Sequence, residues 1–156
     1  MRNVTGVAIL LLMLALSTAV AGCQKAKTGG GVPPDDYRAV ALAEAPATLK
    51  AYYERMKAVP GLVTFQQDGE TYVLLMAGKV EEAGLAVEVV DVRRPPSGSG
   101  QPVRLMARLA ESAAAEGRYP YALLALVGAE NERFVARLAT RGETVEELQG
   151  LPLEER

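Results

Sequence analysis

The chain has no histidine, and Cys23 is the one cysteine among its 156 residues. Zinc sites built from histidine and cysteine are therefore excluded within this chain. Nucleophile pairs in which a histidine activates a serine or a cysteine are excluded as well. A single thiol forms no intramolecular disulfide, so a folded domain of this length must be stable without that crosslink.

Aromatic residues are also few, and the chain has no excess of positive charge. The chain has no tryptophan and two phenylalanines, while the hydrophobic residues make up 49% of it. The core must therefore consist mainly of valine, leucine, alanine and tyrosine. The formal net charge is −2, and no basic stripe is present that would neutralise phosphates, so nucleic-acid binding is not expected. This composition predicts one folded domain with a modest core.

Residues 1–22 have the three parts of an export signal. Arg2 is the positive charge at the start, Val7 to Leu16 is an unbroken apolar run, and small residues lead up to Gly22. An uncleaved membrane-spanning helix is the alternative, but the apolar run is short for a span, which needs about 20 residues. We therefore interpret residues 1–22 as a signal peptide.

The end of this segment, Val20 to Cys23, reads Val-Ala-Gly-Cys and resembles the lipobox of bacterial lipoproteins. The resemblance implies a diacylglyceryl thioether on Cys23, cleavage before it and, in some bacteria, acylation of the new terminus, commonly with palmitate. Two or more acyl chains hold a protein stably on a bilayer. We expect a lipid-anchored protein at the extracytoplasmic face of the cell membrane.

Residues 23–36 are rich in glycine and proline and show no apolar periodicity, which is typical of a flexible tether. Gly29 to Gly31 would suggest a phosphate-binding loop, but the Lys-Ser/Thr that such a loop requires does not follow. Asp35 and Asp36 are too few for calcium, which takes six to eight oxygen ligands. We expect no metal or other cofactor.

Residues 37–142 carry the pattern of a globular domain. Tyr37–Leu42 is a short predicted strand, and Pro46 is well suited to the first turn of a helix. One apolar stripe at helical spacing follows, formed by Leu49, Tyr52, Tyr53 and Met56, and the helix should end before Pro60-Gly61. The tyrosine pair suggests a binding site, but packing of the helix on a sheet explains it better.

After Gly61 the hydrophobic period changes to two, which predicts strands. Asp68-Gly69 is a hairpin signal because both positions tolerate positive φ. The predicted strands are Leu62–Gln66, Thr71–Ala77, Leu85–Val92, Val103–Leu109, Tyr119–Val127 and Phe134–Thr140. A helix over Val103–Ala115 is the alternative for one of them, since its residues favour helices.

Residues 143–156 are predicted as a short helix, Glu143–Gln149, followed by a charged tail. The predicted fold class is α+β and mainly β: one N-terminal helix followed by a small antiparallel β-sheet or sandwich.

The order of these segments resembles the C-terminal domain of PrcB, a subunit family of a secreted protease complex. The resemblance rests on Leu49–Glu54, Gly69–Gly78 and Tyr119–Leu124, within about half of the chain. The chain departs from the family at its Thr-Gly-Gly-Tyr turn, where residues 82–85 retain Gly84 alone. The resemblance implies the fold and a role as an accessory subunit beside a secreted protease or another envelope protein. It implies no proteolytic activity in the domain itself.

Acidic and serine side chains leave a hydrolase as the alternative function. A glycosidase would need paired carboxylates, and the candidates are Glu81, Glu82, Glu88, Asp91 and Glu111. Ser97 and Ser99 lie in a Gly/Pro-rich loop that would not hold a nucleophile near a base, and Lys79 beside Ser112 would need a buried lysine. We expect no catalysis.

Three segments are the best candidates for contact with a partner: the turn Lys79–Gly84, the loop Arg93–Gln101 and the strand start Tyr119–Tyr121. Arginine and tyrosine are frequent among the residues that contribute most to binding. The candidate partner-binding residues are Lys79, Gly84, Arg93, Arg94, Tyr119 and Tyr121. The alternative is that these turns only connect strands and that the tyrosines pack inward. The expected function is a non-catalytic binding or scaffold module.

Overall fold

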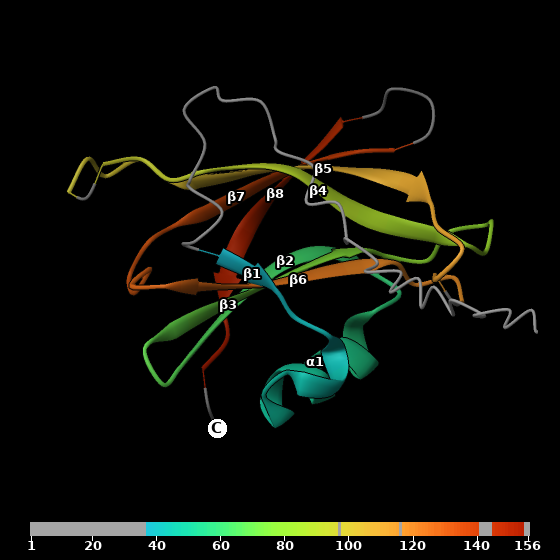
Figure 1. Ribbon diagram of the computed structural model, residues 1–156, viewed down its shortest axis with the longest axis horizontal. Helices are drawn as coiled ribbons and strands as arrows, with labels where there is room; N and C mark the ends of the chain where they lie inside the picture. Colours follow the sequence, from blue (N-terminus) through green and yellow to red (C-terminus); the bar gives the residue numbers. More distant parts are fainter. Residues whose placement is uncertain (1–36, 97, 116, 141–144, 155–156) are drawn as a thin grey trace, which may run out of the picture.

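The computed structural model describes residues 37–96, 98–115, 117–140 and 145–154 (Figure 1). The predicted signal peptide, Cys23 and the predicted tether lie outside the described residues, as do Ser97 and the first two residues of the helix predicted over Glu143–Gln149. In the part of the chain that is described, no helix has the length and apolar character needed to cross a bilayer.

The described chain is mainly β with one α-helix, which confirms the coarse fold class. The elements are β1 (Tyr37–Ala39), a 3-10 turn (Leu42–Glu44), α1 (Ala47–Met56), β2 (Pro60–Gln67), β3 (Glu70–Ala77), β4 (Leu85–Arg93), β5 (Val103–Glu111), β6 (Tyr121–Val127), β7 (Phe134–Ala139) and β8 (Val145–Pro152). The helix follows β1, so the prediction that a helix comes first in the domain is wrong.

The eight strands form one sheet in the order β1-β6-β3-β2-β8-β7-β5-β4. The sheet curls, and Figure 1 shows β4, β5 and β7 on the side away from α1, with β1, β2, β3 and β6 between them and the helix. We call β1, β6, β3 and β2 the helix-covered half, and β7, β5 and β4 with the first part of β8 the open half. β8 joins the two halves, because Val145–Gln149 pairs with β7 and residues 150–152 pair with β2.

The sheet is mixed, so the predicted small antiparallel sheet is wrong. β5 and β7 run parallel, and so do β2 and β8, while the other neighbours are antiparallel. The cause is the path of the chain: after β5 it crosses to β6 in the helix-covered half and returns as β7 beside β5. Alternation of apolar residues reports which face of a strand is buried but not which strand lies beside it.

The predicted helix over Glu143–Gln149 is wrong where the structure describes it, because Val145–Pro152 is a strand. Its glutamates, leucine and glutamine are good helix formers, yet two neighbouring strand edges offer backbone hydrogen bonds to this segment. Leu138 pairs with Glu146 on one side, and Val63 pairs with Leu151 on the other. Leu148 also packs against the core, so tertiary pairing overrides local helix propensity.

The main core fills the space between the two halves of the sheet. Its buried residues are Leu62, Val73, Leu75, Val87, Val92, Val103, Leu105, Ala107, Leu124, Leu126, Ala129, Phe134, Ala136 and Leu138. The buried positions on β5 and β7 alternate with exposed or partly exposed ones, which confirms the strand prediction for Val103–Leu109 and excludes the helix there.

A second core lies under α1 on the outer face of the helix-covered half. Leu49 and Tyr53 of the predicted helical stripe are buried there against Val63, Leu74 and Leu123. Because β3 and β6 are thus covered on both faces, four consecutive residues in each, 73–76 and 123–126, are buried. The interpretation of the helical stripe as a packing surface is confirmed.

The predicted hairpin between β2 and β3 is also confirmed. Asp68 and Gly69 have φ values of 54° and 77°, the two positive values of the type I′ turn that suits the right-handed twist of the strands. The register then pairs Gln67 with Glu70 directly across the turn.

Gly150 lies where β8 passes from β7 to β2, and a side chain there would be crowded against β7. A Cβ atom there would lie 3.0 Å from both the Cβ and the carbonyl oxygen of Phe134. We expect Gly150→Ala to lower the free energy of unfolding by about 1–3 kcal/mol, because β8 or β7 must shift. Urea unfolding measures this loss.

The control is the next residue, Leu151, whose side chain is 63% exposed. Leu151→Ala should change the free energy of unfolding by less than about 0.5 kcal/mol. A Gly150→Ala protein as stable as the wild type would contradict the close packing of β8 against β7.

Candidate binding surface

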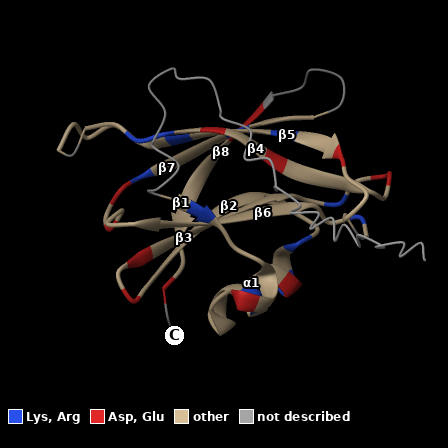
Figure 2. Ribbon diagram, in the orientation of Figure 1, with Lys and Arg blue, Asp and Glu red and all other residues tan. Residues whose placement is uncertain are grey.

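The outward side chains of the open half form a surface rich in arginine. The strand register places Arg93, Arg104, Val135 and Gln149 in one row and Asp91, Met106, Arg137 and Glu147 in the next. Glu88 and Arg108 form a third pair. We call these ten residues the arginine face. Figure 2 shows both basic and acidic segments on the strands of this half.

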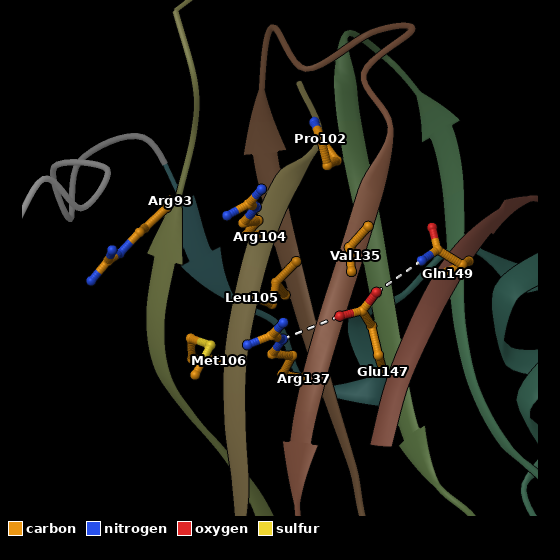
Figure 3. Close-up of a pocket in the computed structure, with 9 residues that line it drawn as sticks. All are labelled: Arg93, Pro102, Arg104, Leu105, Met106, Val135, Arg137, Glu147 and Gln149. Carbon is orange, nitrogen blue, oxygen red and sulfur yellow. Dashed lines mark hydrogen bonds and ion pairs between the residues drawn. The ribbon is translucent and has the colours of Figure 1, made fainter. Parts of the chain in front are cut away.

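Part of the arginine face is concave, with a volume of about 600 Å³. The concavity is lined by Arg93, Pro102, Arg104, Leu105, Met106, Val135, Arg137, Glu147 and Gln149 (Figure 3). Leu105 is buried on the inner face, so it lines the concavity from the β5 backbone. The lining therefore combines apolar, cationic and other polar groups from four adjacent strands, β4, β5, β7 and β8, with the residue before β5.

Three arginines of the face each have a carboxylate partner. Arg93 Nε lies 2.7 Å from Asp91 Oδ2, and Arg108 Nε lies 2.8 Å from Glu88 Oε2. Arg137 Nε lies 3.2 Å from Glu147 Oε2, a contact drawn in Figure 3. The hydrogen bond and charge of Glu88 raise the pKa of Arg108. These guanidinium groups are thus already engaged by acids on the same face.

Arg104 differs from its neighbours. Its side chain is exposed, and among the residues that the structure describes it has no hydrogen bond or ion pair. It lies directly opposite Arg93 on β4 and Val135 on β7, and like charges directly opposite on a sheet repel. Within the described part of the chain, Arg104 is therefore the one cation of the arginine face without a compensating acid.

Exposed apolar side chains lie beside these charges. The register of β4 and β5 shifts between Val89 and Asp91, so Val90 is an extra residue of a β-bulge. Val90 is 52% exposed, and Met106 opposite the bulge is 42% exposed. Methionine and arginine are both enriched in protein interfaces.

Of the two arginines predicted at the β4 end, Arg93 lines the concavity and Arg94 does not. Arg94 Nη2 lies 2.9 Å from Glu132 Oε1, and the same side chain donates hydrogen bonds to the carbonyl oxygens of Val127 and Gly128. Arg94 thus connects the end of β4 to the β6–β7 connection. We infer a structural role for Arg94 and a surface role for Arg93.

Tyr119 and Tyr121 lie beside α1 and not on the arginine face. The Tyr53 hydroxyl donates a 2.8 Å hydrogen bond to the Tyr119 carbonyl, and the Tyr53 and Tyr121 rings stack edge to face with centroids 4.9 Å apart. Lys57 Nζ lies 5.3 Å from the centroid of the Tyr119 ring. These contacts favour the packing interpretation of the two tyrosines.

Lys79 and Gly84 belong to the connection between β3 and β4. Lys79 is exposed, and its amide donates to the Ala58 carbonyl at 3.2 Å. Gly84 has a φ of 82°, and its carbonyl accepts a hydrogen bond from the Ser112 amide at 2.9 Å. Neither residue lines the concavity, so the structure separates them from Arg93.

Two of the carboxylates named for a hydrolase, Glu88 and Asp91, lie on the arginine face. Glu88 and Asp91 each form an ion pair with an arginine. In the described ranges, no three side chains of the kinds that ligate metals lie together. Glu88 and Asp91 therefore stand beside cations, as parts of a charged surface.

Sequence reasoning missed most of this surface. The period-two pattern predicts the strand Val103–Leu109, but it does not reveal which strands lie beside Arg104, Met106 and Arg108. Glu147 and Gln149 were assigned to a helix, which hid their place beside Arg137 and Val135. The alternation along β5 was the one usable signal.

The Tyr53 hydroxyl predicts a pH dependence of stability. Burial raises the pKa of Tyr53 to about 12, against about 10 in an unfolded chain. The protonated form is thus favoured by folding, and its contribution to stability is complete below pH 10 and is lost as the pH rises from about 10 to 12.

We therefore expect Tyr53→Phe to lower the free energy of unfolding at neutral pH by about 0.5–1.5 kcal/mol, because the hydrogen bond to Tyr119 is lost. The difference from the wild type should shrink between pH 10 and 12. Denaturant unfolding across this range measures it, and a difference that stays constant with pH would contradict the buried, hydrogen-bonded hydroxyl.

No family model, curated protein or solved structure matches this chain, so the resemblance to the PrcB family stays a hypothesis.

Proposed function

We propose that this chain is a non-catalytic binding module, anchored by lipid on Cys23 at the extracytoplasmic face of a membrane, which presents the arginine face to a partner protein. The observation that carries the proposal is that the two outer faces of the sheet differ in what covers them. One is covered by α1 with an apolar contact. The other carries exposed Arg104 and Met106 around a concavity.

The chemistry of the arginine face supports binding over catalysis. Interfaces combine apolar contact with arginine and a polar surround, and Met106, Val135 and the arginines offer this combination. A carboxylate-dependent hydrolase, such as a glycosidase, is the weaker proposal. It would need a carboxylate free to act as acid or nucleophile, and Glu88 and Asp91 are held by arginines.

The partner class follows from the resemblance and from the proposed anchor. A chain similar to PrcB would act as an accessory subunit of a secreted protease complex, and a lipid on Cys23 would hold it where such a protease or another envelope protein is found. The face proposed for that contact lies on the opposite side of the sheet from α1 (Figure 1).

The anchor is tested by Cys23→Ser. This substitution removes the thiol that the lipid requires, so we expect the protein to leave the membrane fraction or to remain as an uncleaved precursor. Fractionation with immunoblotting measures both outcomes. Normal processing together with unchanged membrane association would contradict the proposed lipidation.

The binding face is tested by a photo-reactive amino acid at Met106 of the full-length protein in intact cells. We expect illumination to give one discrete adduct with another protein, identified by mass spectrometry. The matched control carries the same amino acid at Ala51, an exposed position on α1. Equal adducts from both positions, or none from Met106, would contradict the proposed face.

A further inference from the structure

The guanidinium of Arg104 has no ion-pair partner among the described residues, and this indicates what kind of chemical group the arginine face binds. Its row across the sheet, Arg93, Arg104, Val135 and Gln149, contains two cations and no acid. Because Arg93 is engaged by Asp91 of the next row, the uncompensated charge is at Arg104, within the concavity. The site is complementary to an anion.

A carboxylate is the anion that fits the surroundings of Arg104 best. Arginine presents a planar fork of donors that matches a carboxylate with two parallel hydrogen bonds. Glu88, Asp91 and Glu147 lie on the same face, where a continuous anionic surface such as a lipid bilayer would be repelled by them. A small number of separate carboxylates, placed between these acids, avoids that repulsion.

The spacing along β5 indicates that the carboxylate belongs to a protein segment. Arg104 and Met106 point to the same side of the strand, about 7 Å apart along it. Alternate side chains of an extended partner segment have this same spacing. A segment that alternates acidic and apolar residues would place an acid at Arg104 and an apolar side chain at Met106, beside Val135.

We propose that the arginine face binds an acidic, extended segment of a partner protein, with an Asp or Glu side chain of that segment on Arg104 and an apolar side chain on Met106. This inference rests on the proposed binding function and adds the chemistry of the partner. Arg93 lies directly across from Arg104 at the edge of the site, with its Nε bonded to Asp91.

The test uses the full-length protein in a nonionic detergent at low ionic strength. The probe is a fluorescent peptide of alternating Glu and Leu, and a peptide of alternating Gln and Leu is its neutral counterpart. We expect the acidic peptide to bind and to raise the fluorescence anisotropy. Arg104→Gln should weaken binding of the acidic peptide at least tenfold, or about 1.4 kcal/mol. The neutral peptide should bind the wild-type protein no more tightly than the acidic peptide binds the variant.

The matched control is Arg118→Gln, which makes the same change of charge at an exposed position in the connection between β5 and β6. It should leave the affinity within about twofold, as expected for a surface charge outside the site. Circular dichroism checks that both variants keep the wild-type strand content.

Four results of the peptide experiment would overturn the inference: no binding of the acidic peptide at millimolar concentration, equal losses in the two variants, equal binding of the neutral peptide, or displacement of the peptide by phosphatidylglycerol added to the micelles. The last would assign the face to anionic lipid. A protein adduct at Met106 that persists in Arg104→Gln would leave the proposed binding function standing while this inference fails. If Arg104→Gln loses both the Met106 adduct and the binding of the acidic peptide, the binding function and this inference are both supported.

Discussion

The pairing of β8 with two strands is the constraint on which the rest of the fold depends. Its first part hydrogen-bonds antiparallel to β7, and its last part hydrogen-bonds parallel to β2. These two ladders convert what would be two separate sheets into one curled sheet, whose halves face each other across the main core. Gly150, where β8 passes from β7 to β2, lies so close to Phe134 that a side chain there would be unusually tightly packed.

The curled sheet has two outer faces, one apolar and covered by α1, the other charged and exposed. The helix-covered half presents Val63, Leu74 and Leu123, which are kept from water by Leu49 and Tyr53 of α1. The open half instead carries arginines and acids in ion pairs. Exposed pairs of this kind contribute about 0–1 kcal/mol each to stability, so they keep the face soluble more than they stabilise the fold.

This difference gives the arginine face its significance. Other polar residues on this face would stabilise the fold equally well. The two guanidinium groups of Arg93 and Arg104, directly opposite each other, slightly destabilise it. The exposed Met106 and Val90 add apolar area that a purely soluble face would not need. The arginine face thus combines an uncompensated positive charge with exposed apolar area beside a concavity. A partner segment with acidic and apolar side chains would be complementary to it.

Most strands and the helix could be predicted from the sequence, because their signals are local. The stripe from Leu49 to Met56 indicates one apolar helix face, Asp68-Gly69 indicates a hairpin, and the alternation from Val103 to Leu109 indicates a half-buried strand. Each is a pattern that short-range geometry imposes. The structure confirms all three.

The rest depends on contacts between distant residues. The segment Val145–Gln149 has helix-forming residues and becomes a strand only because β7 and β2 lie on either side of it. The arginine face could not be predicted for the same reason: Arg104, Arg137 and Glu147 come from three strands whose order in the sheet no local pattern reveals. Arg93 was found because a loop rich in glycine and proline marked its neighbourhood.

Amide hydrogen exchange along β8, followed by mass spectrometry or NMR, is the most direct test of this account. If β8 joins the two halves, the paired amides of residues 145–151 should exchange as slowly as those of β3 and β6, through global unfolding. Exchange in β8 that is fast and independent of overall stability would mean that this strand is not part of the sheet. The description of one curled sheet, with Glu147 and Gln149 of β8 on its arginine face, would then be contradicted.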